Sequence, residues 1–249
     1  METRNLLVTL SFDGRHFHGW QVQNNAVTVM GTFQDALEAV LGTRPDIKGC
    51  SRTDSGVHAR DYKVSFKTES SILCERLIPA LNSNLPRTIA VTACREVPLD
   101  FHARYSVVSK RYVYRFLNTP VRDPFQDGLA LHIPYRLDAE FLNNEAKSFI
   151  GKHDFSAFQN TGRPVDDAVR TIFESNVVRK DNIVEFSVTG DGFLYNMVRI
   201  MAGTLLDIHN SKIPAGSIHD IIMSQKRSQA GATVPACGLT LEEVIYNEM

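Results

Sequence analysis

The sequence has few cysteines, and none of them form a close pair. The four, Cys50, Cys74, Cys94 and Cys237, stand 24, 20 and 143 residues apart. Structural zinc sites usually take their ligands as close pairs, so this spacing argues against one. A disulfide framework is not expected in a chain of this size in a reducing compartment. We therefore expect the four thiols to be buried as small hydrophobic side chains.

Long hydrophobic runs are also absent. No stretch of about 18 apolar residues exists, which excludes a membrane-spanning helix. Residues 1–10 lack the apolar core and cleavage site of a secretory signal, so we expect a cytoplasmic protein. The motifs GxGxxG, GxxxxGK[ST] and HExxH are missing, which leaves nucleotide cofactors and zinc-protease chemistry without support. The histidines lack metal-ligand spacing, and we expect neither a metal nor a cofactor.

What the sequence does contain is typical of a globular protein. Of its 249 residues, 43% are hydrophobic and 22% charged. The net charge is −1, but residues 1–125 carry 16 basic and 12 acidic side chains, and residues 126–249 carry 11 and 16. The segment 101–122 holds five cations, no acid and three tyrosines: Arg104, Lys110, Arg111, Arg115, Arg122, Tyr105, Tyr112 and Tyr114. Such a mixture suits RNA phosphates and unstacked bases, or it is a solvated strand face.

The periodicity of the chain predicts strands and helices in alternation. Strands are expected over residues 5–12, 62–68, 88–97, 105–117, 171–179, 183–189 and 238–246. Helices are expected over residues 32–41, 75–81, 138–150, 193–209 and 218–223, the first capped by Thr32 with Asp35 and the third by Asp138. Adjacent strands favour an α+β fold with a mostly antiparallel mixed sheet and flanking helices. The Pro-containing connection after residue 118 suggests two halves, 1–118 and 119–249.

The densest polar cluster is residues 49–60, GCSRTDSGVHAR, and its one central carboxylate is Asp54. An aspartate beside a glycine is often an ordinary turn, because its side chain bonds its own backbone. Alternatively, the several donors around Asp54 keep it ionised and oriented, as a nucleophile or a base requires. The residues alone leave both interpretations open.

Six separated blocks resemble the TruA family of tRNA pseudouridine synthases, over essentially the whole chain. The most specific is residues 52–59, RTDSGVHA, which is similar to the family's RTDxGVHA. The others are residues 12–21 (FDG and FHGWQ), Asn82 with 84–86 (NLP), 101–114 (FHAR and KRYVY), 193–199 (FLYNMVR), and Ala236 with 238–239. Six blocks in the family's order make a chance match implausible.

The resemblance implies a fold, a reaction and a set of site residues. The fold is the pseudouridine synthase fold, two similar halves around a central cleft. The reaction is isomerisation of uridine to pseudouridine at positions 38, 39 and 40 of the tRNA anticodon arm, by a homodimer without a cofactor or metal. Asp54 corresponds to the nucleophile, Tyr112 to the tyrosine that stacks on the uracil, Arg199 to the partner of the aspartate, and Arg52 to a residue that helps extrude the base.

Weaker candidates for contact with the RNA backbone are Lys110, Arg111, Arg104 and His58. The sequence also departs from the family pattern at four positions. Ser51 and Ser55 replace the usual Gly and Ala, Met30 replaces a frequent Gln, and Thr240 replaces an aromatic residue. These positions bear on the choice of substrate site more than on the chemistry.

Two other functions are consistent with parts of the sequence. One is a non-catalytic RNA-binding or RNA-remodelling module on the same fold, although such a module needs no nucleophile. The other is a carboxylate-dependent glycosidase or nucleosidase. That chemistry usually takes a second positioned acid, and the cluster offers only Asp61.

Overall fold

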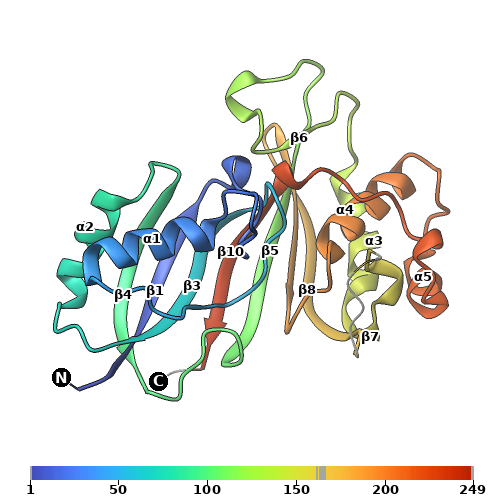
Figure 1. The fold of residues 1–249 in the computed structure, drawn as a ribbon. Helices are drawn as coiled ribbons and strands as arrows, with labels where there is room; N and C mark the ends of the chain where they lie inside the picture. Colours follow the sequence, from blue (N-terminus) through green and yellow to red (C-terminus); the bar gives the residue numbers. More distant parts are fainter. Residues whose placement is uncertain (1, 161, 163–166, 248–249) are drawn as a thin grey trace. The chain divides into compact units, whose positions relative to one another are not determined.

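The computed structural model describes residues 2–160, 162 and 167–247, which form two compact units (Figure 1). The first unit comprises Met1–Val108 and Thr240–Met249, and the second comprises Ser109–Leu239. This grouping differs from the halves 1–118 and 119–249, because the end of the chain returns to the first unit as a strand. Each unit is described by itself.

The first unit is a sheet with helices on one face. Its strands are β1 (Arg4–Phe12), β2 (Lys48–Gly49), β3 (His58–Thr68), β4 (Ile89–Val97) and β10 (Leu239–Tyr246). They lie in the order β4-β1-β3-β10, with β2 on β3. β1 is antiparallel to both neighbours, whereas β10 runs parallel to β3. Helices α1 (Val29–Leu41) and α2 (Cys74–Asn84) lie together on this sheet (Figure 1).

β1 is buried on both faces because a loop covers the face opposite to its main core. Alternate residues of a strand point to the same side, so Asn5 and Leu7 share a face. Leu7 clusters with Val97 and Ala103. The Asn5 amide nitrogen donates to the carbonyls of Pro98 (2.8 Å) and Phe101 (3.0 Å). The segment after β4 is thereby fixed over the sheet.

Two predicted element starts in the first unit are wrong by three residues or more. α1 begins at Val29 instead of Thr32, because the Thr28 hydroxyl accepts from the Gly31 amide and supplies an earlier N-cap. Its predicted end is confirmed, since Gly42 has φ 71°. β3 begins at His58 instead of Tyr62, because its first residues pair with β10.

The second unit has the same mixture of elements. Its strands are β5 (Val107–Leu117), β6 (Leu131–His132), β7 (Gly151–Asp154), β8 (Val169–Lys180) and β9 (Ile183–Gly190). β5, β9, β8 and β7 pair antiparallel in that order, and β6 pairs parallel with β5. The helices are α3 (Ala139–Ala146), α4 (Met197–His209) and α5 (Ile218–Ser224). Ten mostly antiparallel strands and five helices among the described residues confirm the α+β prediction.

Local signals in the second unit are mostly confirmed. Asp138 caps α3 by accepting from the Phe141 amide at 3.0 Å, and α3 then tightens into a 3₁₀ turn at Lys147–Phe149. The β8–β9 hairpin turns at Asp181, which has φ 52°. α4 is almost entirely buried, as expected, but it begins at Met197 instead of Phe193. Asn196 has φ 61°, a conformation that a helix interior does not accommodate.

The cysteines are free, as expected, but they are not all buried. Cys50 is buried, and Cys74, Cys94 and Cys237 are half-buried. Among the helices that the structure describes, none combines the length and apolarity that crossing a membrane requires.

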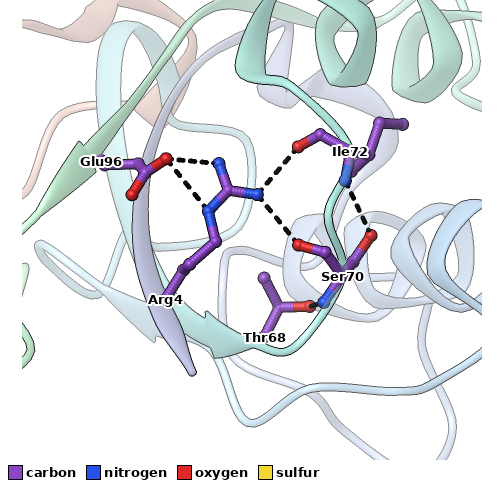
Figure 2. Close-up of polar contacts among 5 residues, drawn as sticks. All are labelled: Arg4, Thr68, Ser70, Ile72 and Glu96. Carbon is purple, nitrogen blue, oxygen red and sulfur yellow. Dashed lines mark hydrogen bonds and ion pairs between the residues drawn. The ribbon is translucent and has the colours of Figure 1, made fainter. Parts of the chain in front are cut away.

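Arg4 ties the start of β1 to two other segments of the first unit (Figure 2). Its guanidinium donates to Glu96 on β4 at 2.5 and 3.0 Å, and to the carbonyls of Ser70 and Ile72 at 2.9 and 3.0 Å. Bonds from a charged donor are worth about 1.5–3 kcal/mol each, whereas exposed ion pairs are worth about 0.2–1 kcal/mol.

We therefore expect Arg4→Met to lower the free energy of unfolding by about 2–3 kcal/mol, since it orphans both carbonyls. Glu96→Gln, which keeps the carbonyl contacts, should cost less than about 1 kcal/mol. Urea denaturation followed by circular dichroism measures both. Equal losses would contradict the assignment of the stabilisation to the carbonyls.

Candidate active site

The loop that carries Asp54 is held mainly by backbone contacts. It runs between β2 and β3 and packs on the segment that follows β1. The Thr53 carbonyl accepts from the Trp20 amide at 3.2 Å. The Phe17 carbonyl accepts from the Gly56 amide and from the Ser55 hydroxyl, both at 3.3 Å. These bonds fix the residues on both sides of Asp54, which is half-buried.

Two glycines allow the two segments to approach this closely. A Cβ on Gly14 would lie 2.1 Å from the carbonyl oxygen of Val57. A Cβ on Gly19 would lie 2.5 Å from the carbonyl oxygen of Thr53, and Gly19 also has φ +84°. Because the obstructing atoms are backbone, no rotamer change relieves either contact. The position of the Asp54 loop therefore depends on both glycines.

His58, at the start of β3, contacts Asp13 and Gly14 in the segment that follows β1. The His58 ring is buried, and its Nδ1 accepts from the Gly14 amide at 3.1 Å and lies 3.3 Å from an Asp13 oxygen. Asp13 also accepts from the guanidinium of Arg15 at 2.5 to 3.0 Å. Burial raises the pKa of Asp13, but the hydrogen bonds and charge of Arg15 outweigh it, and the net pKa lies below its usual value.

Thr53 leaves a buried hydroxyl beside Asp54. The residue is 8% exposed, and its Oγ1 makes no hydrogen bond within the part of the chain that the structure describes. A buried hydroxyl without a partner costs about 1–3 kcal/mol. The Thr53 hydroxyl lies next to the candidate nucleophile. A ligand bound at this loop could therefore form a hydrogen bond with it.

In the second unit, β5 presents Tyr112 from a packed aromatic face. Tyr112 is 6% exposed, and its ring meets that of Phe193 edge to face at 5.1 Å. Tyr114 lies two residues further on the same face, and its hydroxyl donates to the Pro235 carbonyl at 2.7 Å. Burial raises the pKa of Tyr114 above its usual value. The packing fixes the plane of the Tyr112 ring without help from a ligand.

The basic residues of β5 divide between its two faces. Strand alternation puts Lys110 on the face of Tyr112 and Arg111 on the opposite face. Arg115 shares the face of Arg111 and pairs with Glu185 at 3.1 Å. The cations of this strand therefore do not form a single patch.

Arg199 is fixed from within its own unit. It lies in the first turn of α4, where its Nε donates to the Val234 carbonyl at 2.8 Å and its Nη1 donates to the Asn196 Oδ1 at 2.6 Å. Asn196 adopts the left-handed conformation just before the helix, so its side chain turns back to meet the guanidinium. Arg199 is thus a half-buried cation with a defined orientation.

Comparison with known proteins identifies the family of the chain. The family model described as tRNA pseudouridine synthase matches residues 9–106 and 146–247. The chain belongs to this family. Relatives named tRNA pseudouridine synthase A from Acetivibrio thermocellus and Clostridium acetobutylicum are 44% and 42% identical over 243 residues, covering 98% of this chain and 100% of each relative. A third of that name, from a Thermoanaerobacter species, is 41% identical with the same coverage.

A solved structure of a Cbf5-Nop10-Gar1 complex aligns with 94% of this chain and 57% of its own, at 10% identity and a TM-score of 0.35. That similarity is too low to add to the argument. The family match itself covers Asp54, Arg52 and Arg199. Tyr112, Lys110 and Arg111 lie between its two matched ranges, in a part of the chain that the full-length relatives cover.

The structure gives some of the sequence-predicted residues a different environment from the one expected. His58, expected at the RNA backbone, is an internal partner of Asp13 and Gly14. Arg52 and Arg104, which are 52 residues apart in sequence, line the same hollow of the first unit. Among the described residues, no group of three or more His, Cys, Asp or Glu side chains is arranged to hold a metal ion.

Sequence reasoning missed the residues that hold the Asp54 loop. Asp13, Gly14 and Gly19 belong to a block that resembles the family's, but the resemblance itself assigns these residues no role. The two glycines of the block were the available signal, because a glycine in a short polar segment often marks a close backbone approach.

Gly19→Ala should displace the Asp54 loop. We expect it to lower the rate of the family reaction by at least about 10-fold, since misplacing a reacting group by about 1 Å can cost 100-fold. Gly42→Ala is the matched control, because Gly42 also has a positive φ (+71°) but nothing within 4 Å of the added Cβ. Both should lose about 1–2 kcal/mol of stability from backbone strain. Equal activities of the two variants would refute the positioning role of Gly19.

Asp13 should make a pH-dependent contribution to stability. Because the pKa of Asp13 in the folded state lies below its usual value, ionised Asp13 stabilises the fold at any pH above that usual value. The contribution is lost as the pH falls through the lowered pKa. At neutral pH we expect the free energy of unfolding of the wild type to exceed that of Asp13→Asn by less than about 1 kcal/mol, because the Asp13–Arg15 ion pair is partly exposed. The gap should close in acid, as thermal denaturation at a series of pH values measures. A gap independent of pH would contradict this origin.

Proposed function

We propose that this protein isomerises uridine to pseudouridine in tRNA, with Asp54 as the catalytic carboxylate. The observation that carries the proposal is the Asp54 loop, which lies in a family-matched range and is held in place by backbone contacts on both sides of the carboxylate. The names of the full-length relatives support tRNA as the substrate.

The chemistry requires little beyond positioned groups. The N1–C1′ bond of the uridine breaks, the uracil rotates, and a C5–C1′ bond forms. The base loses its C5 proton and gains one at N1, so the reaction needs neither an oxidant nor an energy source. A carboxylate can attack C1′, promote elimination to a glycal, or add to C6 of the uracil. Each route splits one hard step into easier ones and needs an ionised carboxylate.

We assign Tyr112 to the target uracil and Arg199 to the catalytic carboxylate. Tyr112 would stack on the flipped uracil, a contact worth about 1–3 kcal/mol per base. This role is supported by its packed environment, which fixes the ring plane in advance. Arg199 would pair with the catalytic carboxylate and hold it ionised. This role is supported by the two hydrogen bonds that orient its guanidinium.

The remaining assignments concern the RNA. A base inside a stem must be flipped out at a cost of a few kcal/mol, and Arg52 would help to offset that cost. Positions 38, 39 and 40 of the anticodon arm are the proposed targets. Lys110, Arg111 and Arg104 are proposed to contact the RNA backbone. A homodimer, a cytoplasmic location and a reaction without a cofactor or metal complete the proposal.

Asp54→Asn tests the catalytic role. We expect tritium release from C5-labelled uridine in tRNA to fall by at least about 10⁴-fold, the scale on which loss of a nucleophile acts. Binding of tRNA should change by no more than several-fold, because the substitution removes a charge but no volume. Retained turnover would refute the assignment.

Asp61→Asn is the matched control, since Asp61 lies in the same region but serves the fold. It accepts from Lys63 at 2.5 Å and from the Val244 amide at 2.9 Å. We expect this variant to be less stable but active once folded. Wild-type protein that binds tRNA without releasing tritium would indicate an RNA-binding module, and release of free uracil would indicate a glycosidase.

A further inference from the structure

The first unit contains a hollow beside the Asp54 loop, lined by two residues of the proposed RNA contact, Arg52 and Arg104. Its volume is about 280 Å³. Three parts of the unit line it: the segment around Trp20 and Met30, residues 46–52, and the turn at 102–105. Ligand pockets for small molecules begin at about 300 Å³, so the hollow can take a group the size of one nucleotide but not a folded RNA segment.

The hollow carries cations without acidic partners. Lys48 pairs with Asp46 at 2.6 Å, so an acid partly offsets its positive charge. By contrast, neither Arg52 nor Arg104 makes an ion pair with any acid in the described part of the chain, although both line the hollow. Two such guanidinium groups around a small cavity suit a phosphate, because phosphate oxygens accept from Arg in a forked arrangement.

His102 lies among these cations, and its pKa is below the usual value. Burial is the main cause, and the positive charges of Lys48 and Arg104 lower the pKa further, partly opposed by Asp46. Its Nδ1 accepts from the amides of Arg104 (3.1 Å) and Tyr105 (3.4 Å). The proton of the neutral ring is therefore on Nε2, which can donate to an anion.

An exposed aromatic stack lies at the same hollow. Tyr105 is 76% exposed, and its ring lies 4.4 Å from that of His102, tilted by 37°. The guanidinium of Arg104 lies over the Tyr105 ring at 5.6 Å. A tyrosine that is mostly exposed and packed beside a second ring and a guanidinium is suited to stack on an unpaired base.

The turn that presents these side chains is held rigidly. Ala103 is fully buried, its amide donates to the Ser65 hydroxyl at 3.0 Å, and its carbonyl accepts from the Tyr246 hydroxyl at 2.7 Å. The hollow is lined on another side by Trp20, whose ring stacks on Tyr62 at 4.3 Å. Both walls are thus preorganised, which reduces the entropy cost of binding.

From these observations we infer that the hollow binds one nucleotide of the RNA strand next to the target uridine. Its phosphodiester lies on Arg52 and Arg104, and its base stacks on Tyr105. Arg52 is two residues from Asp54, a separation of at most about 7 Å along the backbone, so the bound nucleotide is a near neighbour of the target. This inference rests on the proposed function and adds a second base that the enzyme recognises.

A double-mutant cycle between protein and RNA tests the inference. The RNAs are anticodon stem–loops that carry the target uridine and a single abasic site at each flanking position in turn. We expect Tyr105→Ala to weaken binding of the intact stem–loop by about 5- to 140-fold, the range that one base stack supplies. Tyr105→Phe should stay within about 2-fold of wild type. One of the abasic RNAs should bind the wild type more weakly than the intact RNA does. The same abasic RNA and the intact RNA should bind Tyr105→Ala with equal affinity.

The single tryptophan gives a second readout. Because Trp20 lines the hollow, intact stem–loop should change its fluorescence in Asp54→Asn protein, which binds RNA without turnover. The abasic RNA identified by the cycle should not change it. Uridine monophosphate is tested alone, and a response equal to that of the stem–loop would overturn the assignment to an RNA strand.

Matched variants separate this site from general electrostatics and from the reaction itself. Arg104→Gln should weaken binding by at least about 5-fold more than Arg87→Gln, which removes an exposed charge elsewhere in the same unit. Phe173→Ala controls for loss of an exposed aromatic ring. If no abasic position couples to Tyr105 while wild type still forms pseudouridine, the nucleotide site is refuted and the proposed function stands. If the wild type forms no pseudouridine, the proposed function itself is refuted.

Discussion

The candidate active site depends on one close contact between two stretches of backbone. The segment after β1 and the loop before β3 approach so closely that neither Gly14 nor Gly19 could carry a Cβ without striking a carbonyl oxygen. Backbone hydrogen bonds are less variable in length and direction than side-chain contacts. A carboxylate that must meet a single reacting atom is better held by a loop of this kind than by a flexible turn.

The sequence predicted elements well where the signal is local. The β8–β9 hairpin and the Asp138 cap need only neighbouring residues, and both are confirmed. The early start of β3 could not be read in this way, because it depends on pairing between His58 and Thr240, 182 residues later. The late start of α4 could not be predicted either. The left-handed backbone of Asn196 interrupts the helix that the apolar spacing predicts from residue 193, and spacing does not reveal that conformation.

The resemblance assigns roles to residues by their position, and the structure shows the surroundings of each. His58 lies inside the most specific block, where we expected a contact with the RNA backbone. In the fold it is buried against Asp13 and the Gly14 amide. Arg104 and Tyr105 belong to a long basic segment of the sequence, and only the three-dimensional structure shows that they precede β5 in a turn that lines the same hollow as Arg52. A sequence motif shows where a residue stands in the chain, whereas the burial and the contacts of its side chain limit the role it can have.

The C-terminal strand links these features. β10 pairs with His58 and Ala59, directly after the Asp54 loop, and its Val244 amide binds Asp61. Two residues later, Tyr246 holds the carbonyl of Ala103 and thereby the turn with His102 and Tyr105. One strand therefore supports both the Asp54 loop and the hollow beside it. Under the proposed function, a strand that fixes the two at a constant spacing would let a target uridine and its neighbouring nucleotide bind together, which would couple recognition of the RNA to placement of the reacting base.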